Sequence, residues 1–317
     1  MTECEATVEH DMESANQAAT ELEKSVSRET VIRRDEPLAK RTTLRVGGPA
    51  DLYVEPANEA DLAAVVRFCA GHKRPLFVLG RGSNLLVRDQ GFRGVVICLA
   101  QPAFSRIEFT GERLRCGAGA KLKAVAVEAK RHGVAGLEFL EGIPGTVGGA
   151  LRMNAGAMGV QTFENVVSVR YLDHEGKVHT KTPDELEVHY RHVPSLTRNY
   201  AVSAIFRGQP AAKEDIVRLL DESQKKRRIS QPAASSAGCI FKNPAGGPAG
   251  KLVDELGLKN CAVGKARVSD VHGNFIVNDG GATASEMLEL IEKIKTTARE
   301  VRGIELETEV QIVGEEA

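Results

Sequence analysis

Short runs of apolar and β-branched residues, separated by glycine and proline, make up most of the chain from about residue 40 onward. Such runs, with apolar and polar positions that alternate, are typical of β-strands. The stretch VVSVRYLDHEGKVHTKT (166–182) alternates on both sides of a polar turn at 173–176 and predicts a β-hairpin. The other early strand segments are DLYVEP (51–56), PLFVLG (75–80), GVVICLA (94–100) and RIEFTGERLRCGAGA (106–120).

Segments with a helical spacing of apolar residues lie between and after these strands. EADLAAVVRFCAGHK (59–73) and KLKAVAVEAKRHG (121–133) end in basic residues and glycine, as helices often do. This mixture predicts an α+β architecture. The C-terminal part predicts helices at EDIVRLLDESQKKRRISQP (214–232), AGKLVDELGLK (249–259) and ASEMLELIEKIKTTAREVRG (284–303), and strands at NFIVN (274–278) and LETEVQIVG (306–314).

The length of the chain, 317 residues, exceeds the usual size of one domain, which is about 100 to 150 residues. Residues 1–30 are rich in Glu, Ala, Ser and Thr and nearly lack large apolar side chains, which predicts a disordered tail. We expect a first domain over 31–208, with subdomains at about 31–100 and 101–208, and a C-terminal domain over 209–317.

Composition and charge exclude several classes of protein. The chain has 42% hydrophobic and 27% charged residues and a formal net charge of −1, without the basic excess of a nucleic-acid binder. It has no run of about 18 apolar residues that would span a membrane, and its acidic N-terminus does not resemble a signal peptide. We expect a cytoplasmic protein with small-molecule partners, no nucleic acid and no membrane; the oligomeric state stays open.

The six cysteines are scattered, without CxxC or Cys/His spacing. This pattern disfavours a metal site and, in a reducing compartment, a disulfide framework. Cys69, Cys98 and Cys116 lie inside apolar segments and are expected in the core. Cys239, in SSAGCIFKNP (235–244), could be a core residue, a metal ligand, a nucleophile or a proton donor.

Two glycine-rich segments could bind a phosphorylated ligand. In LGRGSNLLV (79–87), glycines follow a strand and let backbone N–H groups turn toward an anion, with Ser and Asn as further donors. The segment is neither GxGxxG nor a P-loop, and an ordinary turn is the alternative.

The second segment is GLEFLEGIPGTVGGALRMNAGAMG (136–159), with seven glycines in 24 positions and almost no charge after Glu141. This glycine density lets the backbone approach a flat ligand closely, although a loop-rich packing corner would have the same composition. Because the two segments follow different strands of one domain, a large two-ended ligand such as a flavin dinucleotide would satisfy both.

Seven motifs that occur in order from about residue 40 to 314 together resemble the UDP-N-acetylenolpyruvoylglucosamine reductase family. Each motif alone would be weak, but the set is specific. The absence of an insertion after Tyr190-Arg191 resembles the shorter, second type of this family. The motifs are TTLRVGGPADLYVEP (42–56), VLGRGSNLLVRDQGFRGVVI (78–97), LEFLEGIPGTVGGALRMNAGAMG (137–159), AGCIFKNP (237–244), AGKLVDELGLK (249–259), HGNFIVNDGGAT (272–283) and GIELETEVQIVG (303–314).

The resemblance implies the two-subdomain FAD-binding fold of the vanillyl-alcohol oxidase type, with a C-terminal α+β substrate-binding lobe. It also implies reduction of UDP-N-acetylglucosamine enolpyruvate to UDP-N-acetylmuramate in peptidoglycan precursor biosynthesis, with NADPH as reductant. Non-covalent FAD is expected, because the two glycine-rich loops lack the His or Cys that covalent attachment would use. The implied cofactor-binding residues are Gly80, Arg81, Gly82, Ser83, Asn84, Gly142, Ile143, Pro144, Gly145, Thr146, Gly148, Gly149, Asn154, Gly156 and Arg228.

Arg191 and Cys239 match two of the family's catalytic positions. The guanidinium of Arg191 could hold the substrate carboxylate through paired N–H donors, although a surface ion pair is the ordinary alternative. Val193 stands where a serine usually follows the Tyr-Arg pair, and Ser195 is a possible substitute. The family places Ser or Cys at position 239. A thiol with a pKa of about 8.5 is mostly protonated at neutral pH, so it could donate a proton.

Glu305, Glu307 and Glu309 would share one face of a strand, and their spacing alone cannot choose between them. The family pattern L-x-x-E-V selects Glu309 as the third catalytic residue. The resemblance also implies substrate contacts by Tyr190, Lys242 and Asn243, with Lys242 suited to a phosphate. For Arg228, compensation of a helix dipole explains the charge equally well.

Two alternatives to this reductase stay open. One is another flavin oxidoreductase of the same fold that acts on a sugar or an alcohol. The other is a flavin-binding redox sensor without turnover, in which Cys239 would be the responsive thiol. The motifs AGCIFKNP and LETEV favour reduction of an enol ether over alcohol oxidation.

Overall fold

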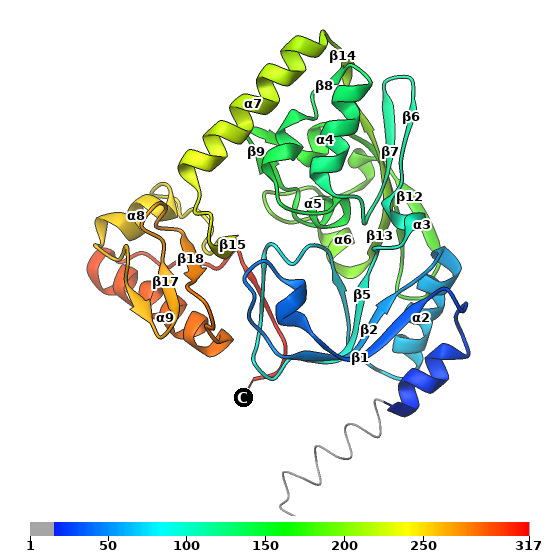
Figure 1. The fold of residues 1–317 in the computed structure, drawn as a ribbon, viewed down its shortest axis with the longest axis horizontal. Helices are drawn as coiled ribbons and strands as arrows, with labels where there is room; N and C mark the ends of the chain where they lie inside the picture. Colours follow the sequence, from blue (N-terminus) through cyan, green and yellow to red (C-terminus); the bar gives the residue numbers. More distant parts are fainter. Residues whose placement is uncertain (1–15, 317) are drawn as a thin grey trace, which may run out of the picture. The chain divides into compact units, whose positions relative to one another are not determined.

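The computed structural model describes residues 16–316, which divide into two compact units (Figure 1). Unit 2 contains two segments from the first third of the chain, and these had been assigned to the first domain. The domain limits predicted from the sequence stay predictions. Within the described residues, unit 1 comprises the chain up to Glu36, Asp51–Gly80 and Gly94–Gln224, and unit 2 comprises Pro37–Ala50, Arg81–Arg93 and the chain from Lys225 onward.

The first sheet of unit 1 contains the strands β1 (Val31–Pro37), β2 (Pro49–Glu55), β5 (Phe92–Cys98) and β3 (Leu76–Leu79), in that order. Helix α2 (Glu59–Gly71) buries its apolar side in the same core. It begins at Asn58, whose side chain accepts a hydrogen bond from Asp61 N at 3.0 Å. The short helices near this sheet are η1 (Leu38–Arg41) and α3 (Pro102–Ser105).

Part of the predicted N-terminal tail is ordered, so the prediction of disorder over 1–30 is wrong for 16–30. Residues 16–23 are helical and bury Leu22 in the core beneath α2. The Asp61 carboxylate accepts hydrogen bonds from Ser27 N (2.9 Å), Ser27 Oγ (2.6 Å) and Thr30 Oγ1 (2.8 Å). One apolar helical face and one buried carboxylate therefore anchor a segment of low overall hydrophobicity. Residues 1–15 lie outside the described residues.

The second sheet of unit 1 has five antiparallel strands in the order β12-β11-β13-β7-β6. Its β11–β12 pair confirms the hairpin predicted over 166–182. The strands are β6 (Ile107–Thr110), β7 (Arg113–Gly117), β11 (Val166–Leu172), β12 (Val178–Lys181) and β13 (Tyr200–Arg207). Helices α4 (Leu122–Arg131), α5 (Val147–Met153) and α6 (Pro194–Arg198) share the core of this sheet.

Shorter elements connect these parts of unit 1. They are β8 (Val134–Ala135), η2 (Glu138–Gly142), β9 (Gly156–Ala157), β10 (Val160–Gln161), η3 (Thr162–Glu164), η4 (Pro183–Glu185) and β14 (Gln209–Pro210). Helix α7 (Lys213–Ser230) then leads from unit 1 into unit 2.

Unit 2 is built on a four-stranded sheet with the order β15-β18-β17-β16. Helix α9 (Ala284–Arg302) and helix α8 (Ala249–Glu255) contribute to its core (Figure 1). The last strand, β19 (Gln311–Val313), pairs in parallel with β4 (Leu85–Val87), so the core includes residues from the first third of the chain as well as from its C-terminal part. The sheet strands are β15 (Ser235–Cys239), β16 (Ala262–Val263), β17 (Ala266–Val268) and β18 (Phe275–Asn278).

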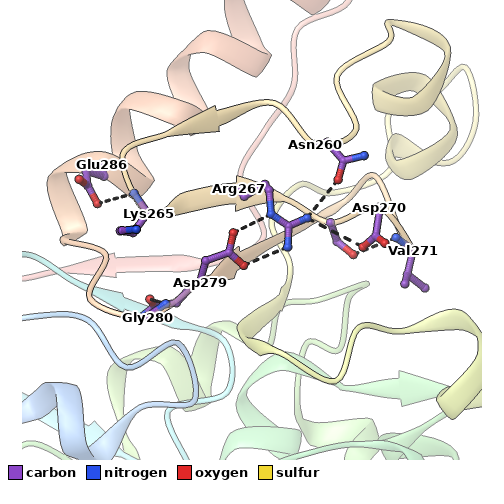
Figure 2. A network of polar contacts seen from close by, with 10 residues as sticks. Asn260, Lys265, Arg267, Asp270, Val271, Asp279, Gly280 and Glu286 are labelled. Atoms are coloured by element: carbon purple, nitrogen blue, oxygen red, sulfur yellow. Dashed lines mark hydrogen bonds and ion pairs between the residues drawn. The ribbon is translucent and has the colours of Figure 1, made fainter.

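A polar network joins the β17 side of this sheet to the start of α9 (Figure 2). Arg267 donates from Nε and Nη2 to the two carboxylate oxygens of Asp279, at 2.6 and 2.9 Å, and from Nη1 to Asn260 Oδ1 at 3.1 Å. Glu286 accepts from Lys265 N at 3.2 Å. The bidentate ion pair fixes the loops around β17. Across the described residues, no helix has both the length and the apolar character needed to cross a membrane.

Candidate functional site

The start of the first glycine-rich segment, Gly80, meets the second at Thr146 within unit 1. Strand β3 ends at Leu79, and a Cβ atom placed on Gly80 would lie 2.6 Å from Thr146 Oγ1. Such an approach is too close for a real Cβ, so a larger residue at position 80 would require the Thr146 side chain to shift. Segments that are about 60 residues apart in sequence therefore lie side by side, as a two-ended ligand would require.

The segment 142–149 is held against the core through its backbone. Val147 N donates to Ala120 O at 2.9 Å, and Gly148 N donates to Ala118 O at 2.7 Å. Residues 142–146 remain half-buried. Backbone hydrogen bonds thus fix the loop to the core, while residues 142–146 keep partial solvent exposure that would let a ligand reach them.

The loop at 81–84 lies in unit 2, where its acceptor groups are used by the protein. Gly82 O accepts from Thr43 N at 3.1 Å and from Thr43 Oγ1 at 3.2 Å. Gly82 has a φ of 62°, and a Cβ there would lie 2.7 Å from Arg41 O. Asn84 Nδ2 donates to Glu309 O at 3.0 Å, while Asn84 O accepts from Gln311 N at 3.0 Å.

Three sequence motifs that were predicted to act together converge in unit 2. Glu309 N and Val310 N both donate to Ile240 O, at 2.7 and 3.3 Å, so the backbone of Glu309 lies beside the residue that follows Cys239. Because Asn84 Nδ2 donates to Glu309 O, the loop 81–84 joins the same cluster. We call residues 82–84, 238–242 and 307–311 the unit 2 cluster.

Cys239 ends strand β15 at a β-bulge. The register of β15 against β18 shifts between Ser236 and Cys239, and Gly238 has a φ of 77°. Bulges turn a strand and redirect its side chains. On the far side of Ile240, Phe241 N donates to Asn274 Oδ1, and Asn274 Nδ2 donates to Phe241 O, both at 2.8 Å. Cys239 is half-buried, whereas Cys69 and Cys116 are fully buried core residues.

The strand predicted over 306–314 is shorter than expected, and the prediction that three glutamates share one face is wrong. Only Gln311–Val313 form a strand, because the preceding residues make a single bridge, Phe241 with Thr308. Glu305 pairs with Arg299 on the surface. Glu307 forms an ion pair with Lys242 Nζ, and Glu307 O accepts from Lys242 N at 2.8 Å.

The remaining predicted residues of unit 2 have mixed surroundings. Asn243 Oδ1 accepts from Ala249 N at 3.0 Å, so this side chain caps α8. Arg228 is exposed on α7. Their predicted contacts with substrate and cofactor stay predictions.

In unit 1, Tyr190 and Arg191 form a tight turn. His189 N donates to His192 O at 2.9 Å, and His192 N donates to His189 O at 3.4 Å. Arg191 has a φ of 57°, a strained conformation for a residue with a side chain. Its guanidinium carbon lies 4.9 Å from the centroid of the Tyr190 ring, which is 55% exposed. Val193, the departure from the family pattern, is fully buried in the core of unit 1.

Known proteins resemble this chain over most of its length. A family model described as the UDP-N-acetylenolpyruvoylglucosamine reductase C-terminal domain matches residues 231–313, and one described as an FAD binding domain matches 50–182. The reductase of Pelobacter propionicus is 45% identical over 287 residues, which cover 89% of this chain and 95% of that protein. The chain belongs to the UDP-N-acetylenolpyruvoylglucosamine reductase family.

Further relatives of this reductase family agree. The Bacillus subtilis reductase is 39% identical over 283 residues, which cover 88% of this chain and 93% of that protein. The crystal structure of the Thermus caldophilus reductase is 37% identical, covers 89% of this chain and 98% of its own chain, and has a TM-score of 0.78. The predicted α+β FAD-binding fold is thereby confirmed, and the chain is a flavin-dependent reductase of peptidoglycan precursor synthesis.

Two residues of this family member were missed by sequence reasoning. Glu141 is buried just before the glycine run, where Oε1 accepts from Gln224 Nε2 at 2.8 Å and from Lys123 Nζ at 2.9 Å. Its Oε2 is buried without a hydrogen-bond partner among the described residues. The only signal in the sequence was an isolated charge at the edge of an uncharged segment. Arg152, at the end of α5, is the second, and it contacts the segment that carries Arg191.

Within residues 16–316, no group of three or more His, Cys, Asp or Glu side chains is arranged to hold a metal ion.

Proposed function

We propose that this reductase converts UDP-N-acetylglucosamine enolpyruvate to UDP-N-acetylmuramate in the cytoplasm, with non-covalent FAD and with NADPH as reductant. The observation that carries the proposal is the convergence of the motifs around Gly82–Asn84, Cys239 and Glu309 in the unit 2 cluster. These three motifs are far apart in the sequence. A site that they share would explain why the fold brings them together.

The residues of unit 1 support binding of FAD. The contact between Gly80 and Thr146 places two glycine-rich backbones next to each other, which suits a pyrophosphate bound through N–H groups. The unpartnered Oε2 of Glu141 could accept a hydroxyl or amino hydrogen of a ligand, which would remove the cost of leaving that oxygen unpaired. When bound, FAD supplies transfer of a hydride from NADPH to the enolpyruvyl carbon.

Each predicted catalytic residue has a distinct task in this reaction. As negative charge develops beside the carboxylate, the Arg191 guanidinium would hold that carboxylate through paired N–H donors. The Cys239 thiol would deliver the proton that completes the reduction, and Glu309 would orient or polarise the enolate through a shared proton. Lys242 would bind the diphosphate of the substrate. It must first exchange its ion pair with Glu307 for the phosphate oxygens.

An anaerobic experiment that separates the two half-reactions tests the proposal. NADPH should bleach the bound flavin, and UDP-N-acetylglucosamine enolpyruvate alone should restore its colour, with UDP-N-acetylmuramate formed in equal amount. If NADPH bleaches the flavin and the carbonyl compound derived from a simple sugar or alcohol restores its colour, another oxidoreductase of the same fold is favoured. A yellow protein that NADPH fails to bleach would favour a redox sensor instead.

A further inference from the structure

Helix α5 (Val147–Met153) connects the predicted flavin loop to the turn that carries Arg191. Its first residues follow Thr146, which touches Gly80. Its last turn and the residue after it contact both sides of the turn at 189–193. All these contacts lie within unit 1.

Asn154 holds the side of the turn that precedes Arg191. It ends α5 in the left-handed conformation, with a φ of 43°, and is only 4% exposed. Its Nδ2 donates to His189 O at 3.4 Å and to Gln161 Oε1 at 2.9 Å, while its Oδ1 accepts from Phe163 N at 3.2 Å. The amide is thus fully engaged, and one of its bonds is directed at the residue that opens the turn.

Arg152 holds the side of the turn that follows Arg191. Its carbonyl oxygen accepts from Val193 N at 3.2 Å, and its Nη1 donates to Thr197 O at 3.2 Å. Burial lowers the pKa of the Arg152 guanidinium below its ordinary value. Among the described residues it forms no ion pair with a carboxylate. Arg152 is half-buried, and a partly desolvated cation without a counter-charge has a free-energy cost, so a role in packing alone would be filled better by an apolar side chain.

The turn itself needs such support. Arg191 has a positive φ of 57°, and strained backbone of this kind persists only where its surroundings over-determine it. We propose that Arg152 and Asn154 are positioning residues, which hold the strained turn from its two sides and thereby fix the orientation of the Arg191 guanidinium toward the substrate carboxylate. This inference rests on the proposed role of Arg191.

The test compares the two half-reactions in Arg152→Met and Asn154→Gly. Methionine keeps the length of the buried stem, and glycine tolerates the left-handed backbone at 154. In Arg152→Met, reduction of the flavin by NADPH should stay within about twofold of wild type. In Asn154→Gly, whose side chain is also an implied cofactor contact, reoxidation is compared with that variant's own FAD content and its own rate of flavin reduction. Reoxidation by the enolpyruvyl substrate should slow about 10- to 100-fold, the size of effect that a misplacement of about 1 Å produces. Arg152→Lys, which keeps a donor, should restore part of the rate.

A matched control is Arg170→Met. Arg170 is also a half-buried arginine of unit 1, but its guanidinium bonds Glu59 at 2.6 Å, outside the turn. This variant should reoxidise at the wild-type rate. Thermal unfolding of every variant, followed by circular dichroism, identifies any that does not fold. If one of Arg152→Met and Asn154→Gly does not fold, the other still tests the proposal.

A double-mutant comparison separates positioning from general damage. In an Arg191→Lys background, whose reoxidation is already slow, Arg152→Met should add less than about twofold, because the two residues act through one guanidinium. If Arg152→Met and Asn154→Gly reoxidise normally, or slow the reaction equally in both backgrounds, the positioning role is overturned while the proposed function stands. Wild-type reoxidation in Arg191→Lys alone would overturn the proposed role of Arg191, and the positioning role with it.

Discussion

At the scale of single residues, the cysteines differ in burial and in the pKa of their thiols. Burial raises the pKa of the Cys69 and Cys116 thiols to about 12, as expected for core residues. Cys239 instead ends a strand at a bulge, one residue from the carbonyl that accepts from Glu309 N. Of these three thiols, Cys239 alone is not fully buried.

Replacement of Cys239 tests whether its thiol delivers the proton. Cys239→Ser retains an exchangeable proton and should keep substantial activity. Cys239→Ala should still be bleached normally by NADPH, but reoxidation by the enolpyruvyl substrate should slow by about 100-fold or more, the usual contribution of a general acid. Stopped-flow absorbance of the flavin measures both steps. Near-wild-type reoxidation of Cys239→Ala would show that water or another group donates the proton.

Replacement of Glu309 tests the choice among the three glutamates. Glu309→Gln should leave FAD bound and NADPH oxidation fast, while reoxidation by substrate falls by about 100-fold. Glu307→Gln is a poor control, because it would release Lys242 from its ion pair. Glu305→Gln is better matched, since its pair with Arg299 lies on the surface and contributes little. Equal rates in wild type and Glu309→Gln would contradict the assignment.

At the scale of elements, patterns within one segment were predicted well and contacts between segments were not. The hairpin at 166–182 follows from alternation around a polar turn, and α9 follows from the helical spacing of apolar residues over 284–303. Residues 16–30 were misread because their anchor, Asp61, lies in another element. The predicted strand is absent over 306–310 because Thr308 forms only an isolated bridge, with Phe241 in a loop, rather than pairing with the edge of a sheet.

Helix α9 also has a cap from a distant segment, which makes the stability of unit 2 depend on pH. Asp89 accepts from Ala284 N and Ser285 N at 2.8 Å and from Ser285 Oγ at 2.7 Å. Burial alone would raise the pKa of Asp89, but these hydrogen bonds outweigh it and lower the pKa below its ordinary value. The folded state therefore gains stability above a pH of about 4, and this gain is lost as the pH falls through the lowered pKa.

Asp89→Ala should accordingly lower the free energy of unfolding by about 1 kcal/mol at pH 7, the usual cost of losing a helix cap. The difference from wild type should shrink as the pH falls below about 4, the ordinary pKa of an aspartate, and through the lowered pKa of Asp89. Denaturant unfolding at both pH values measures it, with the exposed neighbour Gln90→Ala as control. A difference between Asp89→Ala and wild type that does not change with pH would contradict this account.

At the scale of the whole molecule, the two units do not follow the order of the sequence. Segments 37–50 and 81–93 belong to unit 2, although they lie between strands of unit 1. The pairing of β4 with β19 joins residues more than 200 positions apart, and no local pattern predicts a contact of that range. The catalytic candidates could be named only because the family motifs occur together. The contacts that Arg152, Asn154 and Glu141 make with distant segments cannot be read from the motif that contains these residues.

This arrangement predicts that the C-terminal domain expected from sequence, residues 209–317, does not fold alone. Leu44, Val46 and Leu86 are at most 2% exposed and belong to the core of unit 2, and the fragment lacks all three. Burial of each such side chain contributes about 1.5 to 3 kcal/mol, and the sum is comparable to the whole stability of a typical domain, about 5 to 15 kcal/mol.

The fragment should show no cooperative thermal unfolding by circular dichroism, whereas the full chain should. Leu44→Ala in the full chain should lower the melting temperature, since it leaves a cavity in the same core. A fragment with a cooperative transition and dispersed amide NMR signals would show that the core contributed by residues 225–316 is sufficient by itself.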